Sequence, residues 1–108
     1  MTYLGGVVFI ETPIFYRRIQ QYMDDDEYTE LQLYLAAQPD AGKIIKGAGG
    51  MRKLRWAGSG RGKRGGLRVI YYWWVVKDRI SLLLVYPKNE MDDLTAEQVK
   101  ILKNQLAP

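Results

Sequence analysis

Four basic residues stand where a chain could bind an anion and move a proton. Lys53 and Arg55 lie two residues apart in one predicted strand, and Arg68 begins the next strand. Lys88 follows a third strand, so strands that pair in order would bring these cations to one end of a sheet. Like charges gathered together are costly, which makes such a group typical of an anion-binding site. A neighbouring cation also lowers the pKa of a lysine, as a lysine that acts as a general base requires.

The distribution of charge along the chain indicates the same kind of ligand. The protein has 108 residues and a formal net charge of +4. Ten of its 16 lysine and arginine residues lie between Ala41 and Lys77, and none of its 12 aspartate and glutamate residues does. A basic middle between acidic flanks favours a polyanionic partner for one surface of the protein.

The residue types that are missing limit the chemistry. The sequence contains no histidine and no cysteine. Their absence excludes a disulfide framework, the usual zinc sites, cysteine nucleophiles and histidine acid–base catalysis. Any catalysis would have to use lysine, arginine, tyrosine, acidic or hydroxyl side chains. We expect no cofactor and no metal.

A glycine-rich basic segment precedes the second of these strands. Gly60, Gly62 and Gly65 match G-x-G-x-x-G, but the dinucleotide motif opens a helix and this segment opens a strand. The Walker pattern also fails, because Ala57 replaces its first glycine and Arg64 replaces its serine or threonine. We expect a hairpin loop that binds RNA phosphates; the alternative is a solvated loop whose charges only maintain solubility. The predicted RNA- or ribosome-binding residues are Lys46, Arg52, Arg61, Lys63 and Arg64.

The N-terminal part predicts one strand and one helix. "YLGGVVFIET" is typical of a short buried strand. Thr12 provides a helix N-cap, and Pro13 occupies the favoured first helical position. Phe15, Ile19 and Tyr22 have the spacing of one helical face, which predicts an amphipathic helix.

A second helix is predicted to begin at the acidic run 24–27. Carboxylates there accept hydrogen bonds from unpaired N–H groups and favour the positive end of the helix dipole. Metal binding by this run is the less favoured interpretation. Tyr28, Leu31 and Leu35 again have helical spacing, and Pro39 ends the helix. The following segment, "PDAGKIIKGAGG", is predicted to be a loop.

The C-terminal half predicts three strands and a last helix. In "MRKLRW", Lys53 and Arg55 face one way and Leu54 the other. "LRVIYYWWVV" and "ISLLLVY" are continuously apolar, which indicates a sheet buried on both faces with the first two helices covering one. Thr95 and Gln98 form a capping box at the last helix. The apolar stripe of that helix is Val99, Leu102 and Leu106.

These elements predict a single α+β domain over residues 1–108. Their order is β-α-α-β-β-β-α, with a small antiparallel sheet at the centre. "MTYLGGVVFIETP" has no basic segment before its apolar stretch, so we expect no signal peptide. The longest apolar run, residues 69–76, is too short to span a bilayer as a helix. We therefore expect a soluble, cytoplasmic protein with no membrane partner.

Two motifs connect the chain to a known family. With "KGAGGMRKLRWAGSGRGKRGGLRVIYYW" and "LLLVYPKNEMDDLT", it resembles the RelE superfamily of toxins, and specifically the HigB-type branch. The resemblance implies a RelE/ParE-like fold and the toxin half of a type II toxin–antitoxin pair. It implies an endoribonuclease that cuts translated messenger RNA in the ribosomal A site, by metal-independent attack of the ribose 2′-OH on the adjacent phosphate. The implied partners are the ribosome, the messenger and a cognate antitoxin, a small helix-turn-helix protein.

The resemblance also assigns roles to residues. Lys53 or Arg55 would be the base, Arg68 would hold the phosphate, and Lys88 would complete the catalytic set. Where RelE has Lys-Arg, this chain has Lys88 followed by asparagine. Thr95 stands near the RelE tyrosine that stacks on the messenger base; Tyr86 either replaces that tyrosine or packs in the core.

Other interpretations remain beside the nuclease. ParE-type toxins share the fold but poison DNA gyrase, and a non-enzymatic module could bind RNA or the ribosome through the basic loop alone. Lys53, Arg55 and Arg68 together favour the nuclease. Arg68 is expected to remain free for substrate phosphate; the alternative is a structural ion pair with Glu90, Asp92 or Asp93.

Overall fold

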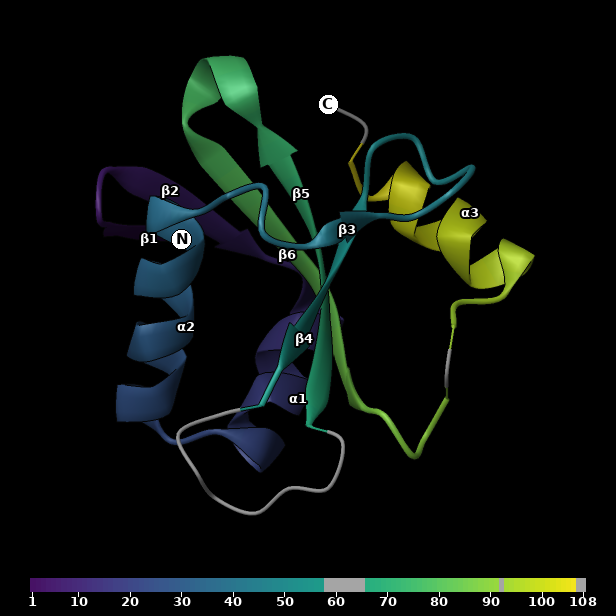
Figure 1. Cartoon of the computed structure of the whole chain (residues 1–108), viewed down its shortest axis with the longest axis horizontal. Coiled ribbons are helices and arrows are strands. Elements are labelled where there is room, and N and C mark those ends of the chain that lie inside the picture. Colours follow the sequence, from purple (N-terminus) through teal and green to yellow (C-terminus); the bar gives the residue numbers. More distant parts are fainter. Residues whose placement is uncertain (58–65, 92, 107–108) are drawn as a thin grey trace.

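The fold is a six-stranded sheet with helices on both sides. The computed structural model describes residues 1–57, 66–91 and 93–106. The strands are β1 (Thr2–Leu4), β2 (Val7–Glu11), β3 (Lys43–Ile44), β4 (Arg52–Trp56), β5 (Leu67–Trp74) and β6 (Arg79–Pro87). The helices are α1 (Pro13–Tyr22), α2 (Asp25–Ala37), α3 (Ala96–Asn104) and the 3-10 turn η1 (Val75–Lys77). The predicted α+β class is confirmed (Figure 1).

The sheet is mixed, so the prediction of an antiparallel sheet was wrong in part. The strand order is β1-β2-β6-β5-β4-β3, and β2 runs parallel to β6 with Phe9 opposite Ile80. Parallel strands need a crossover connection, and the segment between β2 and β6, which contains α1, α2 and the strands β3 to β5, provides it. The predicted meander of β4, β5 and β6 is antiparallel throughout.

Two predicted segments differ in detail. The first strand is a hairpin of β1 and β2, because Gly5 and Gly6 both adopt positive φ, at 61° and 83°, and reverse the chain. The segment read as a loop after α2 contains β3, where Lys43 pairs with Lys53 and Ile44 with Arg52. Strands this short carry no usable periodicity, so neither appeared in the predicted element order.

Helices α1 and α2 pack on one face of the sheet. Phe15 and Ile19 of α1 and Leu31 and Leu35 of α2 are buried against Val69 and other residues of the sheet. The predicted caps are present: Thr12 accepts a hydrogen bond from the N–H of Phe15, and its hydroxyl donates to the carbonyl of Leu83 at 2.8 Å. Asp24 accepts from the N–H of Glu27, as the capping interpretation of the acidic run predicted.

Helix α3 covers the opposite face (Figure 1). Leu102 is buried with Ile70 and Leu84, and Val99 and Leu106 pack against the same cluster, which confirms the predicted stripe. The capping box of Thr95 and Gln98 is also confirmed. Burial on both faces of β5 and β6 follows, as their continuous apolar sequences predicted. Within the described ranges, every helix is too short or too polar to cross a membrane.

Candidate functional site

Strand pairing brings four of the predicted site residues to one end of the sheet. Arg55 of β4 lies directly opposite Arg68 of β5. Residues two apart in a strand point to the same face, so Lys53 shares this face with Arg55. Beyond β6, the backbone N–H of Lys88 donates to the carbonyl of Gly66, two residues before Arg68, at 3.2 Å. We call Lys53, Arg55, Arg68 and Lys88 the sheet-end cluster.

The members of the sheet-end cluster differ in exposure. Arg55 and Lys88 are exposed, whereas Arg68 is only 7% exposed. Arg68 has Arg55 on one side and Tyr86 on the other, and its Nη1 lies 3.4 Å from the carbonyl oxygen of Leu67. From the sequence, Arg68 was expected to remain available for substrate phosphate. The side chain is nevertheless mostly buried, because a residue paired with both neighbouring strands is enclosed by their side chains.

Lys53 forms an ion pair with Asp93, in the connection between β6 and α3. Its Nζ lies 2.6 Å from Oδ1 of Asp93, with the two side chains 22% and 79% exposed. This hydrogen bond, with the charge of Lys53 and a smaller contribution from Arg55, holds the pKa of Asp93 below its ordinary value. From the sequence, Glu90, Asp92 and Asp93 were considered only as alternative partners of Arg68. Glu90 pairs with Arg18 of α1, and Asp92 lies outside the described residues.

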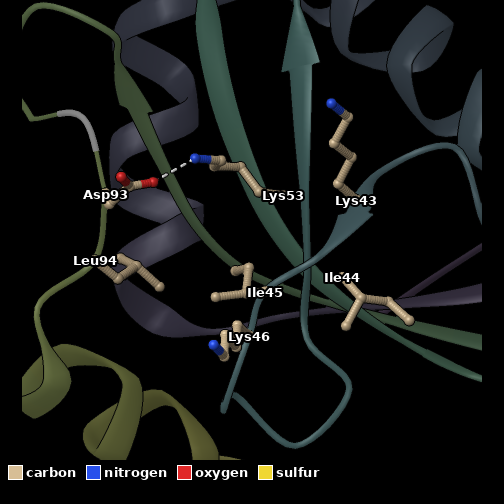
Figure 2. A pocket seen from close by; sticks show the side chains of 7 residues that line it. All are labelled: Lys43, Ile44, Ile45, Lys46, Lys53, Asp93 and Leu94. Atoms are coloured by element: carbon tan, nitrogen blue, oxygen red, sulfur yellow. Dashed lines mark hydrogen bonds and ion pairs between the residues drawn. The ribbon is translucent and has the colours of Figure 1, made fainter.

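A pocket of about 390 Å³ lies beside this ion pair. It is formed by β3, the turn after β3, β4 and the connection that carries Asp93. Its lining residues are Lys43, Ile44, Ile45, Lys46, Lys53, Asp93 and Leu94 (Figure 2). Lys46 was among the predicted RNA-binding residues, whereas Lys43 and Asp93 were not assigned to the site.

The chain before β3 is fixed by hydrogen bonds to its backbone. The hydroxyl of Tyr71 donates to the carbonyl of Pro39 at 2.7 Å and accepts from the N–H of Gly42 at 2.8 Å. Burial raises the pKa of Tyr71, so its phenol stays neutral and can donate. Arg52 donates to the carbonyls of Asp40 and Gly42 at 3.2 and 2.9 Å. RNA binding by Arg52 stays a prediction, and Nη1 of its guanidinium also holds this turn in place.

We predict that Tyr71→Phe lowers the free energy of unfolding by about 1–2 kcal/mol, because the N–H of Gly42 and the carbonyl of Pro39 each lose a hydrogen bond. Chemical denaturation measures this change. Tyr72→Phe is the matched control, since the Tyr72 hydroxyl makes no hydrogen bond to the described part of the chain. Equal losses in the two variants would contradict the anchoring role of Tyr71.

The remaining predicted residues are placed as follows. Tyr86 is fully buried and belongs to the core on the α3 side, so of its two predicted roles the structure shows core packing. Thr95 caps α3. Arg61, Lys63 and Arg64 lie outside the described residues. Among residues 1–57, 66–91 and 93–106, no group of three or more histidine, cysteine, aspartate or glutamate side chains could hold a metal ion.

No protein-family model matches the sequence. The chemistry of the site must therefore be inferred from its own residues. The sheet-end cluster combines an exposed arginine, an enclosed arginine, an ion-paired lysine and an exposed lysine. Such a set can bind a phosphate diester and stabilise negative charge that develops on it.

Proposed function

We propose that this protein is the toxin of a type II toxin–antitoxin system, a ribosome-dependent endoribonuclease that cuts translated messenger RNA in the A site. The observation that carries the proposal is the strand pairing of Arg55 with Arg68, with Lys53 on the same face. These three cations lie within the segment whose sequence resembles HigB-type toxins. Their position on paired strands gives them the fixed backbone that a catalytic group needs.

The proposed reaction uses the substrate's own ribose as the nucleophile. The 2′-oxygen forms a bond to the adjacent phosphorus, and the bond from phosphorus to the 5′-oxygen breaks. The products are a 2′,3′-cyclic phosphate and a 5′-hydroxyl, so the reaction consumes no water and needs no cofactor. A base must remove the proton of the 2′-OH, cations must stabilise the charged phosphorane, and an acid must protonate the 5′-oxygen.

The sheet-end cluster offers groups for each of these tasks. Lys53 and Arg55 are the candidates for the base, of which lysine loses its proton more readily. The planar guanidinium of Arg68 suits two phosphate oxygens. Lys88, exposed beyond β6, can donate a proton to the leaving 5′-oxygen or stabilise its charge. For Lys53 to act as the base, its ion pair with Asp93 has to open.

The proposal also includes the partners of the toxin in the cytoplasm. Cationic side chains would hold the protein on ribosomal RNA through phosphate contacts, which makes its ribosome binding dependent on salt. A cognate antitoxin, expected to be a small helix-turn-helix protein, would suppress the activity.

Induction of the protein in bacteria tests the proposed function. We expect translation to stop and messages to be cut within reading frames, as mapped by sequencing the new RNA ends. The purified protein should cut messenger RNA on programmed ribosomes and leave naked RNA nearly intact. Efficient cleavage of ribosome-free RNA would contradict ribosome dependence. Intact messages with inhibited gyrase supercoiling would establish the gyrase poison, and ribosome binding without cleavage would establish the non-enzymatic module.

A further inference from the structure

The residues that line the pocket beside the Lys53–Asp93 pair carry a net positive charge. Three of its lining residues are lysines and one is an aspartate. Asp93 pairs with Lys53. Lys43 and Lys46 are exposed, and neither makes a hydrogen bond or ion pair with the described part of the chain. The pocket therefore retains two positive charges that face solvent.

The arrangement of the lysines suits an extended polyanion better than one small anion. Lys43 belongs to β3, Lys46 to the turn after it and Lys53 to β4, and Figure 2 shows their ammonium groups pointing in different directions around the pocket. Separate cations of this kind can each meet a different phosphate of one strand. Ile44, which is 62% exposed, and Leu94 add apolar surface on which a ribose or base can pack.

The ion pair in this pocket is easy to displace. The Asp93 carboxylate is mostly exposed and its contact with Lys53 is a surface ion pair, a type that contributes little and is screened by salt. A phosphate brings the same kind of oxygen acceptor to the same ammonium group. Asp93 can therefore swing into solvent when a phosphate takes its place on Lys53.

We propose that this pocket holds the backbone of the single-stranded RNA next to the cleaved phosphodiester, and that Asp93 occupies the phosphate's place on Lys53 until the strand binds. The inference rests on the proposed function, because it takes Lys53 to be shared by the pocket and the sheet-end cluster. Lys43 and Lys46 bind phosphates further along the strand. The strand then leaves the sheet over β3, which is its edge strand.

A double-mutant cycle between Lys53 and Asp93 tests the competition. The probe is a fluorescently labelled single-stranded oligodeoxynucleotide of about six residues, which cannot be cut because it lacks the 2′-OH, and its affinity is measured by anisotropy at low salt. Asp93→Asn should tighten binding by about 1.4-fold to fivefold, the range of an exposed ion pair. In a Lys53→Gln background the same change should have almost no effect, because the competition requires Lys53. Asp26→Asn, an exposed aspartate in the first turn of α2, is the charge-matched control and should leave binding unchanged.

The salt dependence of binding tests the two other lysines. Replacing both Lys43 and Lys46 by glutamine should weaken binding and reduce the slope of log affinity against log salt by about 1.4, since each single-strand phosphate contact contributes about 0.7. Lys77→Gln, at the turn between β5 and β6, is the control and should keep the slope.

The outcomes separate this inference from the proposed function. Tighter binding by Asp93→Asn that persists in the Lys53→Gln background, or equals the Asp26→Asn effect, overturns the competition. An unchanged salt slope in the variant that lacks both Lys43 and Lys46 would contradict the proposed path of the RNA along these lysines. If both binding tests give the expected results while no message is cut on ribosomes, the pocket stands as a single-strand binding site and the nuclease proposal falls.

Discussion

Lys53→Gln is expected to lower ribosome-dependent cleavage by about two to four orders of magnitude, the range for loss of a general acid or base. Glutamine keeps much of the length of the side chain and its polarity but can neither carry the charge nor accept the proton. Lys53 belongs both to the sheet-end cluster and to the pocket, so its loss affects both the reacting phosphate and the neighbouring part of the RNA strand. Single-turnover cleavage on programmed ribosomes gives the rate.

The fold should survive this substitution. Lys53 is a strand residue whose ion pair is with a mostly exposed carboxylate, so melting should stay close to that of the wild type. Asp93→Asn removes the same ion pair from the other side and should have an equally small effect on melting. Lys77→Gln is the activity control, because it removes a lysine from η1, which follows the end of β5 away from Arg68. Cleavage within about threefold of wild type in Lys53→Gln would exclude Lys53 from the chemistry.

Arg68→Ala is expected to lose both cleavage and stability. The residue is 7% exposed and lies between β4 and β6, so alanine removes a packed side chain as well as a charge. We expect the free energy of unfolding to fall by about 1–3 kcal/mol and cleavage to fall by about 10²–10³-fold. Thermal melting and the ribosome assay, carried out on the same preparations, measure the two effects.

Arg68→Met tests the effect of the charged guanidinium separately from the effect of side-chain packing. Methionine is unbranched and flexible enough to fill most of the space of the arginine stem, so it restores apolar packing that alanine removes. We expect Arg68→Met to melt at a higher temperature than Arg68→Ala, with the same loss of cleavage. If Arg68→Met still cuts messages, the guanidinium is not part of the reaction. If it melts as low as Arg68→Ala, the charge itself is structural.

The helices follow from signals contained in short stretches of sequence. Thr12, Asp24 and Thr95 each accept a hydrogen bond from the backbone N–H three residues later, and that chemistry is local. The same holds for β5 and β6, whose continuous apolar sequences indicated a sheet covered on both faces. The α+β class and the antiparallel meander could be predicted because neighbouring elements in the sequence are also neighbours in the sheet.

The candidate site depends on contacts between residues far apart in the sequence. The sequence predicted that strand pairing would gather the sheet-end cluster, but not that Asp93, 40 residues from Lys53, would pair with it. Arg68 was expected to be available for substrate phosphate, and only the packing of both neighbouring strands shows that its side chain is enclosed. Arg52 donates hydrogen bonds to backbone carbonyls, which every residue has, so no residue type in the sequence could indicate that it holds the turn before β3.

The parallel pairing of β2 with β6 also depends on contacts between residues far apart in the sequence. It joins segments about 70 residues apart, and the side-chain pattern of a strand does not specify its partner or direction. Residue types and spacing thus determined the helices, the central strands and the basic character of one end of the sheet. The tertiary structure decided which of those cations are exposed, enclosed or paired, because exposure and pairing depend on neighbours that only folding brings together.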